Sequence, residues 1–199
     1  ISDEVYEKLL YDGLTHVSPA SFGEREYDSV ITVNSFSKTY AMTGWRVGYA
    51  GGPREVIEAA GRLQGNLSSA PNTIAQKAAV EALQGEQDSV DDMRDMFQER
   101  RDLLLDRLED VPGLRCSRPR GAFYAFPDVT ALLGKEYFGS HVGTSSELAE
   151  SLLQNVNMAV VPGSAFGTEG YIRLSYVVGE ETIEKGAERL ASFASEAAE

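Results

Sequence analysis

A lysine flanked by hydroxyl groups and followed by an arginine is the part of this sequence best suited to covalent chemistry. Ser35 and Ser37 precede Lys38, and Arg46 follows it by eight residues. An apolar neighbourhood and nearby positive charge keep part of a lysine's amine unprotonated, and such an amine forms imines with carbonyl compounds. Hydroxyls and a forked guanidinium match a phosphate group. These residues predict a lysine nucleophile beside a phosphate clamp, the combination that pyridoxal 5'-phosphate requires of a protein.

The same run also has an ordinary structural interpretation. Serines before a lysine are common in solvated loops, where they simply form turns. A β-branched run predicts a buried strand over 29–33, so that Lys38 lies in the loop leaving this strand. Residues 47–52 predict a further short strand ended by glycines, and Pro53 opens a helix over 54–63.

The longer run from Ser35 to Gly48 resembles the cofactor-attachment segment of the class I/II aminotransferases, which are fold type I enzymes. The resemblance extends over nearly the whole chain and is strongest to the aspartate-aminotransferase-like branch. It implies that Lys38 holds pyridoxal 5'-phosphate as a Schiff base and that two serines and an arginine bind the phosphate. The motif positions are occupied by Ser35, Ser37, Lys38, Gly44, Arg46 and Gly48.

Asp3 and Tyr6 precede Lys38 by about thirty-five residues and resemble the D-E-x-Y element of the same family. The resemblance implies that Asp3 pairs with the protonated ring nitrogen of the cofactor and that the Tyr6 hydroxyl bonds its phenolic oxygen. An acid and a tyrosine at this spacing also fit an exposed side chain and a half-buried one. The histidines, His16 and His141, lie far from these residues in sequence and lack metal-ligand spacing, so that we expect no metal.

An arginine inside an apolar strand is the next candidate. Residues 171–176 alternate in a strand pattern that includes Arg173, and burying a guanidinium is costly unless it meets an anion. A salt bridge to an acid of the core is one interpretation. The resemblance implies another, because the family places the arginine that binds the substrate's α-carboxylate after a P-G-S-x-F-G element like that at 162–167. A bidentate contact there would orient the amino acid with its Cα–H toward Lys38.

The reaction that the resemblance implies is transamination between an amino acid, aspartate among the candidates, and a 2-oxo acid. The amine of Lys38, released by the incoming substrate, would carry the proton from Cα to the cofactor, first as base and then as acid. Carbon–sulfur lyases and cyclopropane-carboxylate synthase-like proteins of the same fold keep the same lysine, aspartate and arginine and are alternatives. A non-catalytic, truncated module is an alternative of another class.

Enzymes of this family carry about as much sequence again ahead of the D-E-x-Y element, including a phosphate cradle and a ring that stacks on the cofactor. The chain therefore resembles half an aminotransferase, and we expect it to be incomplete and inactive alone. The expected fold is α/β, the truncated end of the large-domain sheet plus a small α+β C-terminal domain. Residues 1–88 would belong to the large cofactor-binding domain, 89–111 to a linking helix and 112–199 to the small domain.

The structure of several further segments can be predicted from the sequence and from the resemblance. By resemblance, the polar connector 66–72 would lie at the interface of a homodimer and reach toward the partner's cofactor phosphate. A capped helix is expected to follow over 73–83. Residues 128–144 are predicted to be loose and could form a mobile cover, before a helix over 145–154. The last helix starts near Glu180, and its buried face is predicted to hold Ile183, Ala187, Leu190 and Ala194.

The charge balance excludes some partners. Asp and Glu number 31 against 18 Lys and Arg, so that a net charge of -13 repels nucleic acid and anionic membranes. Both adaptation to high salt and an ordinary acidic enzyme fit this composition. No apolar run approaches the ~20 residues that span a bilayer, and no signal peptide precedes the first strand. The single cysteine, Cys116, fits a reducing compartment, and we expect a cytoplasmic protein.

Overall fold

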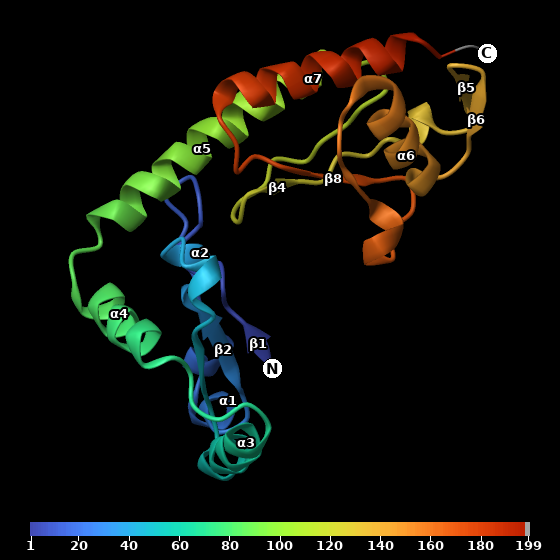
Figure 1. Ribbon diagram of the computed structural model, residues 1–199. Helices are drawn as coiled ribbons and strands as arrows, with labels where there is room; N and C mark the ends of the chain where they lie inside the picture. The colour runs from blue at the N-terminus through green and yellow to red at the C-terminus, as the bar shows by residue number, and fades with distance from the viewer. Residues whose placement is uncertain (198–199) are drawn as a thin grey trace. The chain divides into compact units, whose positions relative to one another are not determined.

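The computed structural model describes residues 1–197, and the chain divides into two compact units (Figure 1). The first unit is Ile1–Arg94, and the second begins at Asp95. The boundary therefore falls inside one continuous helix, Asp88–Glu109 (α5). The three-part division into 1–88, 89–111 and 112–199 stays a prediction.

A three-stranded sheet is the framework of the first unit. Its strands are Ser2–Asp3 (β1), Thr32–Ser35 (β2) and Gly48–Gly51 (β3), and β2 lies between the other two. The β1 and β2 strands are parallel, whereas β2 and β3 are antiparallel. The ladder aligns Asp3 with Val33 on one side of β2 and Gly48 with Ser35 on the other. All three strands therefore meet near the point where β2 ends.

The start of β2 is later than the sequence predicted. The expected strand covered 29–33, but the amides of Ser29 and Val30 both donate to the carbonyl of Glu26, at 3.0 and 2.9 Å. Those bonds continue the short helix Glu24–Tyr27 (α1), so that neither residue is free to join the sheet. The strand begins only at Thr32, where the backbone has left this turn.

Lys38 lies in a helical turn, and the expectation of a loop was wrong. The chain passes from β2 directly into Phe36–Thr39 (α2). The change of conformation has a local cause, because Ser35 is extended and its hydroxyl accepts from the amide of Ser37 at 3.1 Å. A serine in this position replaces a backbone partner that the first turn of a helix lacks.

Two longer helices complete the first unit. Arg54–Leu67 (α3) runs four residues beyond the predicted end, and Thr73–Gln84 (α4) begins where expected. The start of α4 follows from Asn72, whose side chain accepts from the amides of Ile74 and Ala75 at 2.9 and 3.1 Å. Short 3-10 turns lie at Pro19–Ser21 (η1) and Thr43–Trp45 (η2).

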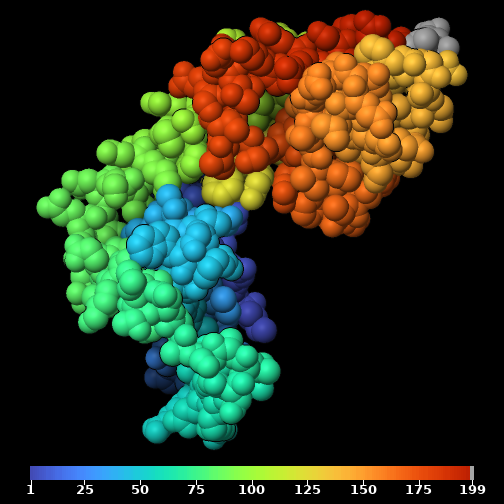
Figure 2. Space-filling view, in the orientation of Figure 1, coloured from blue at the N-terminus to red at the C-terminus, as the bar shows by residue number. Residues whose placement is uncertain are grey.

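A small apolar core joins α2 to α4. Its buried members are Phe36, Met42, Val47, Ala75 and Ala79. The helix α3 contributes no buried residue, and its apolar side chains lie at the surface, where Figure 2 shows the helix in teal. They include Leu63, 61% exposed, and Leu67, 77% exposed. The apolar face of α3 is therefore largely uncovered among residues 1–197.

The second unit contains an antiparallel sheet and two helices that lie against α5 and the sheet. The sheet consists of Tyr124–Ala125 (β4), Ile172–Ser175 (β8) and Val161–Pro162 (β7), with β8 in the middle. The helices are Ser145–Val156 (α6) and Glu180–Ser195 (α7), and α7 lies along α5, as Figure 1 shows. An ion pair of 2.8 Å between Arg107 on α5 and Glu184 on α7 links these two helices. The short turns are Thr130–Leu132 (η3) and Gly163–Phe166 (η4).

The segment 128–144 is folded, and the expectation of a loose cover was wrong. It contains η3 and a hairpin of Lys135–Tyr137 (β5) and Ser140–Val142 (β6). Tyr137 is buried, stacks on Phe193 at 4.4 Å between ring centroids, and donates its hydroxyl to the carbonyl of Leu132 at 2.9 Å. Gly134 and Gly139 of this segment are turn positions with positive φ, and Gly139 closes the hairpin.

Both helices of the second unit agree with their patterns. Thr144 and Glu147 form a capping box at the start of α6, which ends two residues beyond the predicted Gln154. The predicted inner face of α7 is confirmed, because Ile183, Ala187, Leu190 and Ala194 are all buried. No helix among residues 1–197 is long and apolar enough to cross a membrane.

Candidate functional site

The hydroxyls of Ser35 and Ser37 lie together at the end of β2. Their Oγ atoms are 2.9 Å apart, and the Ser35 hydroxyl also lies 3.3 Å from the carbonyl of Val47. Lys38 is the next residue of the same helical turn and is half-buried. The structure therefore gathers two hydroxyls and a lysine in one turn, as the chemistry predicted for this run requires.

The two glycines in the run from Ser35 to Gly48 differ in whether the fold could accept a side chain at their position. A Cβ added to Gly48 would lie 2.8 Å from the carbonyl oxygen of Asn34, so that the close pairing of β3 with β2 admits only glycine. A Cβ on Gly44 would meet nothing within 4 Å. The fold accounts for Gly48 and gives no packing reason for Gly44.

Arg46 is exposed and held in an unusual backbone conformation. Its φ of 54° is in the left-handed region, which costs a non-glycine residue about 1–2 kcal/mol. One guanidinium nitrogen, Nη1, donates to the carbonyl of Thr43 at 3.0 Å, and this is the only hydrogen bond of the side chain within residues 1–197. Arg46 also borders an open hollow of about 510 Å³ together with Ala41, Gly44, Trp45, Asn72 and Ala75. Its remaining donors are available to an anion.

Asp3 is exposed at the end of β1, next to Val33 on β2. Its Oδ1 accepts from the amide of Val5 at 3.2 Å, and this bond orients the carboxylate. Tyr6 follows in a turn in which its carbonyl accepts from the amide of Leu9 at 2.9 Å, and its side chain is half-buried. The parallel pairing thus brings the D-E-x-Y element to the strand that carries Ser35.

A buried acid beside Asp3 was missed. The side chain of Glu4 is 3% exposed, and its two oxygens accept from Ser18 Oγ at 2.7 Å and contact His16 Nε2 at 2.8 Å. His16 lies twelve residues from Glu4 in sequence, and the fold brings the two side chains together. Burial raises the pKa of Glu4, but the hydrogen bonds from Ser18, His16 and Ser2 outweigh it and hold the pKa below the ordinary value.

Acidification should weaken the first unit through Glu4. Because its folded-state pKa lies below the ordinary 4.5, the ionised carboxylate contributes stability that is fully present above pH 4.5 and is lost as the pH falls through the folded-state pKa. We expect the difference in unfolding free energy between wild type and Glu4→Gln, measured in urea, to shrink from about pH 6 to about pH 3. The exposed acid Glu24, changed to Gln, is the control. A difference independent of pH would contradict the assignment.

Arg173 lies on β8 in the second unit, half-buried between two aromatic rings. Its guanidinium carbon is 4.5 Å from the ring centroid of Tyr124 and 4.8 Å from that of Phe166. Stacking of this kind holds a cation without neutralising it. No carboxylate within residues 1–197 forms an ion pair with Arg173, so that the described chain does not supply the salt bridge to a core acid that the sequence also allowed.

The loop before β8 is tightly folded. A Cβ on Gly163 would lie 2.2 Å from the carbonyl oxygen of Thr168 and 2.7 Å from that of Tyr171, so that this position requires glycine. The P-G-S-x-F-G element therefore presents Phe166 to Arg173 from a fixed turn, η4.

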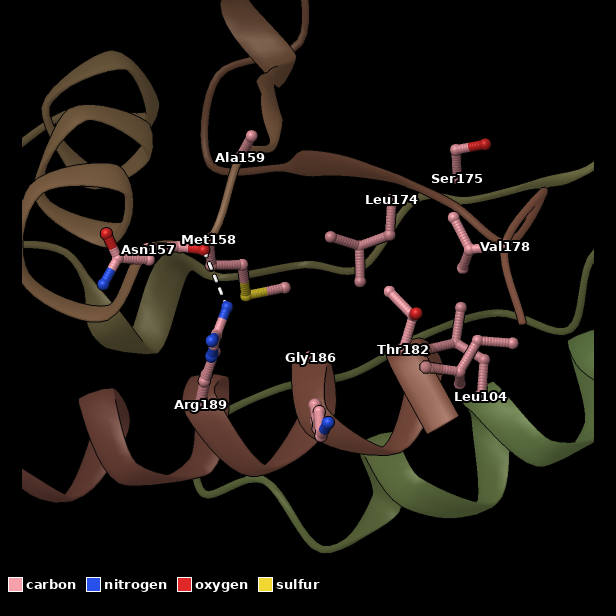
Figure 3. A pocket seen from close by; sticks show the side chains of 12 residues that line it. Leu104, Asn157, Met158, Ala159, Leu174, Ser175, Val178, Thr182, Gly186 and Arg189 are labelled. Carbon is pink, nitrogen blue, oxygen red and sulfur yellow. Dashed lines mark hydrogen bonds between the residues drawn. The ribbon is translucent and has the colours of Figure 1, made fainter. Parts of the chain in front are cut away.

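A separate hollow in the second unit contains none of the predicted site residues. It has a volume of about 280 Å³ and lies between α7, the end of α5 and β8. Figure 3 shows Arg189 reaching across it to the carbonyl of Asn157, at 2.9 Å. Leu104, Leu174 and Val178 line it with mainly apolar surface.

Comparison with known proteins shows which family this chain resembles. The model of the family "Aminotransferase class I and II" matches residues 1–190. The aspartate aminotransferase of Rhizobium meliloti (strain 1021) is 43% identical over 96% of this chain and 47% of its own length. That of Streptomyces avermitilis is 45% identical over 99% of this chain and 48% of its own length. The chain spans about half the length of the curated relatives it matches.

Solved structures agree with this match. A crystal structure of the aspartate aminotransferase from Rhizobium meliloti superposes with a TM-score of 0.94 at 41% identity, covering 98% of this chain and 49% of that one. An aromatic aminotransferase from Pyrococcus horikoshii gives 0.86 at 41% identity, over 96% and 49%. The expected α/β fold, a truncated large-domain sheet with a small α+β domain, is confirmed. The chain belongs to the family of class I and II aminotransferases.

Proposed function

We propose that the full-length protein containing this chain is an aminotransferase that moves an amino group between an amino acid, aspartate foremost, and a 2-oxo acid. Aspartate aminotransferases of this family use pyridoxal 5'-phosphate. The observation that carries the proposal is the helical turn in which Lys38 follows two adjacent hydroxyls, 2.9 Å apart. The names of the relatives support aspartate as a substrate.

The residues of the first unit fit this cofactor. A phosphate needs several donors, and the hydroxyls of Ser35 and Ser37 and the remaining N–H groups of Arg46 are suitable in kind. A pyridine nitrogen that stays protonated needs a carboxylate, which Asp3 offers from an exposed position. When bound, the cofactor withdraws the electrons that the substrate's Cα releases as it loses a proton.

Each side chain then has a defined task. Lys38 would hold the cofactor through its amine and, once freed by the substrate, would act as the base that takes up the Cα proton. Asp3 would keep the ring nitrogen protonated, and the Tyr6 hydroxyl would donate to the ring oxygen. Arg173, stacked between two rings, binds the α-carboxylate of the substrate with both arms of its fork.

A direct test compares the full-length protein with the 199-residue chain. We expect the full-length protein to convert aspartate and 2-oxoglutarate to oxaloacetate and glutamate when supplied with pyridoxal 5'-phosphate. The 199-residue chain should bind the cofactor weakly and show no turnover, because it spans only about half of its relatives. A full-length protein without turnover on any amino acid would favour a non-catalytic module. Full activity of the 199-residue chain would refute the prediction that this chain holds only part of the active site.

The proposal includes a homodimer and a cytoplasmic location. The exposed Leu67 ends α3, and residues 68–72, which include the polar Ser68, Ser69 and Asn72, connect it to α4. We expect this region, 66–72, to lie at the interface, so that Ser69→Cys in the full-length protein forms a cross-linked dimer under oxidation. Light scattering provides the second measurement. A monomer at working salt concentration would contradict the proposed dimer.

A further inference from the structure

The carboxylate of Glu4 is the most completely held acid near the proposed cofactor site, and the mechanism above does not use it. Both of its oxygens have partners, Ser18 Oγ at 2.7 Å and His16 Nε2 at 2.8 Å. Both partners come from the segment that precedes η1, twelve and fourteen residues further along the chain. A buried carboxylate is tolerated only with such partners, so that the three side chains form one unit.

The position of this cluster relative to Asp3 follows from the strand. The amides of Ser2 and Glu4 donate to the carbonyls of Ile31 and Val33, each at 2.8 Å, which fixes the backbone on both sides of Asp3. Successive side chains of a strand point to opposite faces. Glu4 is accordingly buried, whereas Asp3 is exposed and accepts from the amide of Val5. Fixing the side chain of Glu4 therefore limits the rotation of β1 that would move Asp3.

We propose that Glu4, held by His16 and Ser18, is a positioning residue that sets the direction of the Asp3 carboxylate. The inference rests on the proposed function, in which Asp3 meets the ring nitrogen of the cofactor. Glu4 directly follows the carboxyl end of β1, where the side chain of Asp3 is exposed. The Glu4 cluster ties this end to the segment containing His16 and Ser18. A lost tie displaces Asp3 without removing any group that touches the cofactor.

The first experiment measures position without using activity. Hydrogen exchange at the amide of Val5 reports on the Asp3 side chain, because that amide donates to Asp3 Oδ1. In the full-length protein with pyridoxal 5'-phosphate, Glu4→Gln and His16→Ala should speed this exchange about tenfold, the effect of losing one hydrogen bond. His16→Gln retains a side-chain donor and should restore protection. Ala79→Gly, a core change on α4, is the control for a general loss of stability.

The second experiment measures the consequence for turnover. Glu4→Gln and His16→Ala should lower kcat roughly 10- to 100-fold, the effect of a misplacement of about 1 Å, and leave the KM for aspartate unchanged. His16→Gln should recover most of the loss. Asp3→Asn is the reference, because it removes the carboxylate that Glu4 is inferred to position.

The outcomes separate the inference from the proposed function. Faster Val5 exchange together with a lower kcat supports the positioning role. Variants that are merely less stable, and that match Ala79→Gly in both exchange and kcat, overturn it. If Asp3→Asn leaves kcat unchanged, the assigned role of Asp3 fails, and Val5 exchange still decides whether Glu4 orients its neighbour.

Discussion

Replacing Lys38 by alanine in the full-length protein should abolish transamination. Loss of the general base alone lowers kcat by roughly 10²- to 10⁴-fold, and loss of the attachment point for the cofactor adds to this. Lys38→Arg should be equally inactive, because a guanidinium keeps the positive charge but neither forms an imine nor gives up its proton at neutral pH. Comparing the two variants therefore separates the loss of positive charge at position 38 from the loss of a nucleophilic amine.

The measurement has two parts. Coupled assays give kcat, and borohydride reduction followed by peptide mass spectrometry locates the residue that carries pyridoxal phosphate. Lys8→Ala and Lys77→Ala, which change exposed lysines of the same unit, are matched controls and should retain both attachment and turnover. Label on another lysine, or turnover retained in Lys38→Ala, would contradict the assigned role.

Local sequence alone placed Lys38 beside two hydroxyls, whereas its role in catalysis stays a prediction. Ser35, Ser37 and Lys38 are close in the chain, and the turn that holds them is closed by a bond between Ser35 and the amide two residues on. Such short-range geometry is encoded in residue types. The preceding strand begins later than predicted, because the amides of Ser29 and Val30 bond back to α1. Whether such residues end a helix or start a strand depends on the exact backbone path.

Long-range contacts were the part that the sequence did not reveal. Glu4 and His16 are twelve residues apart and meet only because the chain turns back on itself. No sequence periodicity marks such a pair. The one available signal is that Glu4 directly follows Asp3, so that its side chain points to the opposite face of the strand and needs a partner there.

The hairpin β5–β6 was missed for a different reason. Its glycines and short strands look like an irregular loop, and the stabilising contact is the stacking of Tyr137 on Phe193 of the last helix. A ring contact of this kind between residues 56 positions apart has no local signature. By contrast, the inner face of α7 was predicted closely, because its apolar spacing extends over several turns.

The sequence allowed two anionic partners for Arg173, an acid of the core or the α-carboxylate of the substrate. The structure bears on the first of them. The described chain offers Arg173 two rings and no carboxylate, so that a half-buried cation stands without a counter-charge. This arrangement is costly in an empty protein and favourable when an anion binds, because the rings fix the plane of the guanidinium before the anion arrives.

Arg173→Ala should therefore weaken amino-acid binding far more than cofactor binding. Losing a bidentate charged contact costs about 2–5 kcal/mol, which corresponds to roughly 30-fold to several thousand-fold in affinity. Arg173→Lys keeps the charge but loses the fork and the flat stacking surface, so that most of the loss should remain. Tyr124→Phe, which keeps the ring beside Arg173, should bind the amino acid nearly as wild type does.

The two affinities are measured separately in the full-length protein. Quenching of protein fluorescence during titration with pyridoxal 5'-phosphate gives the cofactor Kd, and titration of the loaded protein with the unreactive dicarboxylate maleate gives the anion Kd. Because the cofactor contacts proposed here are all on the first unit, the cofactor Kd should change little in Arg173→Ala. Equal losses for both ligands would instead show that Arg173 supports the fold, and the two rings would then be its structural partners rather than its support at a binding site.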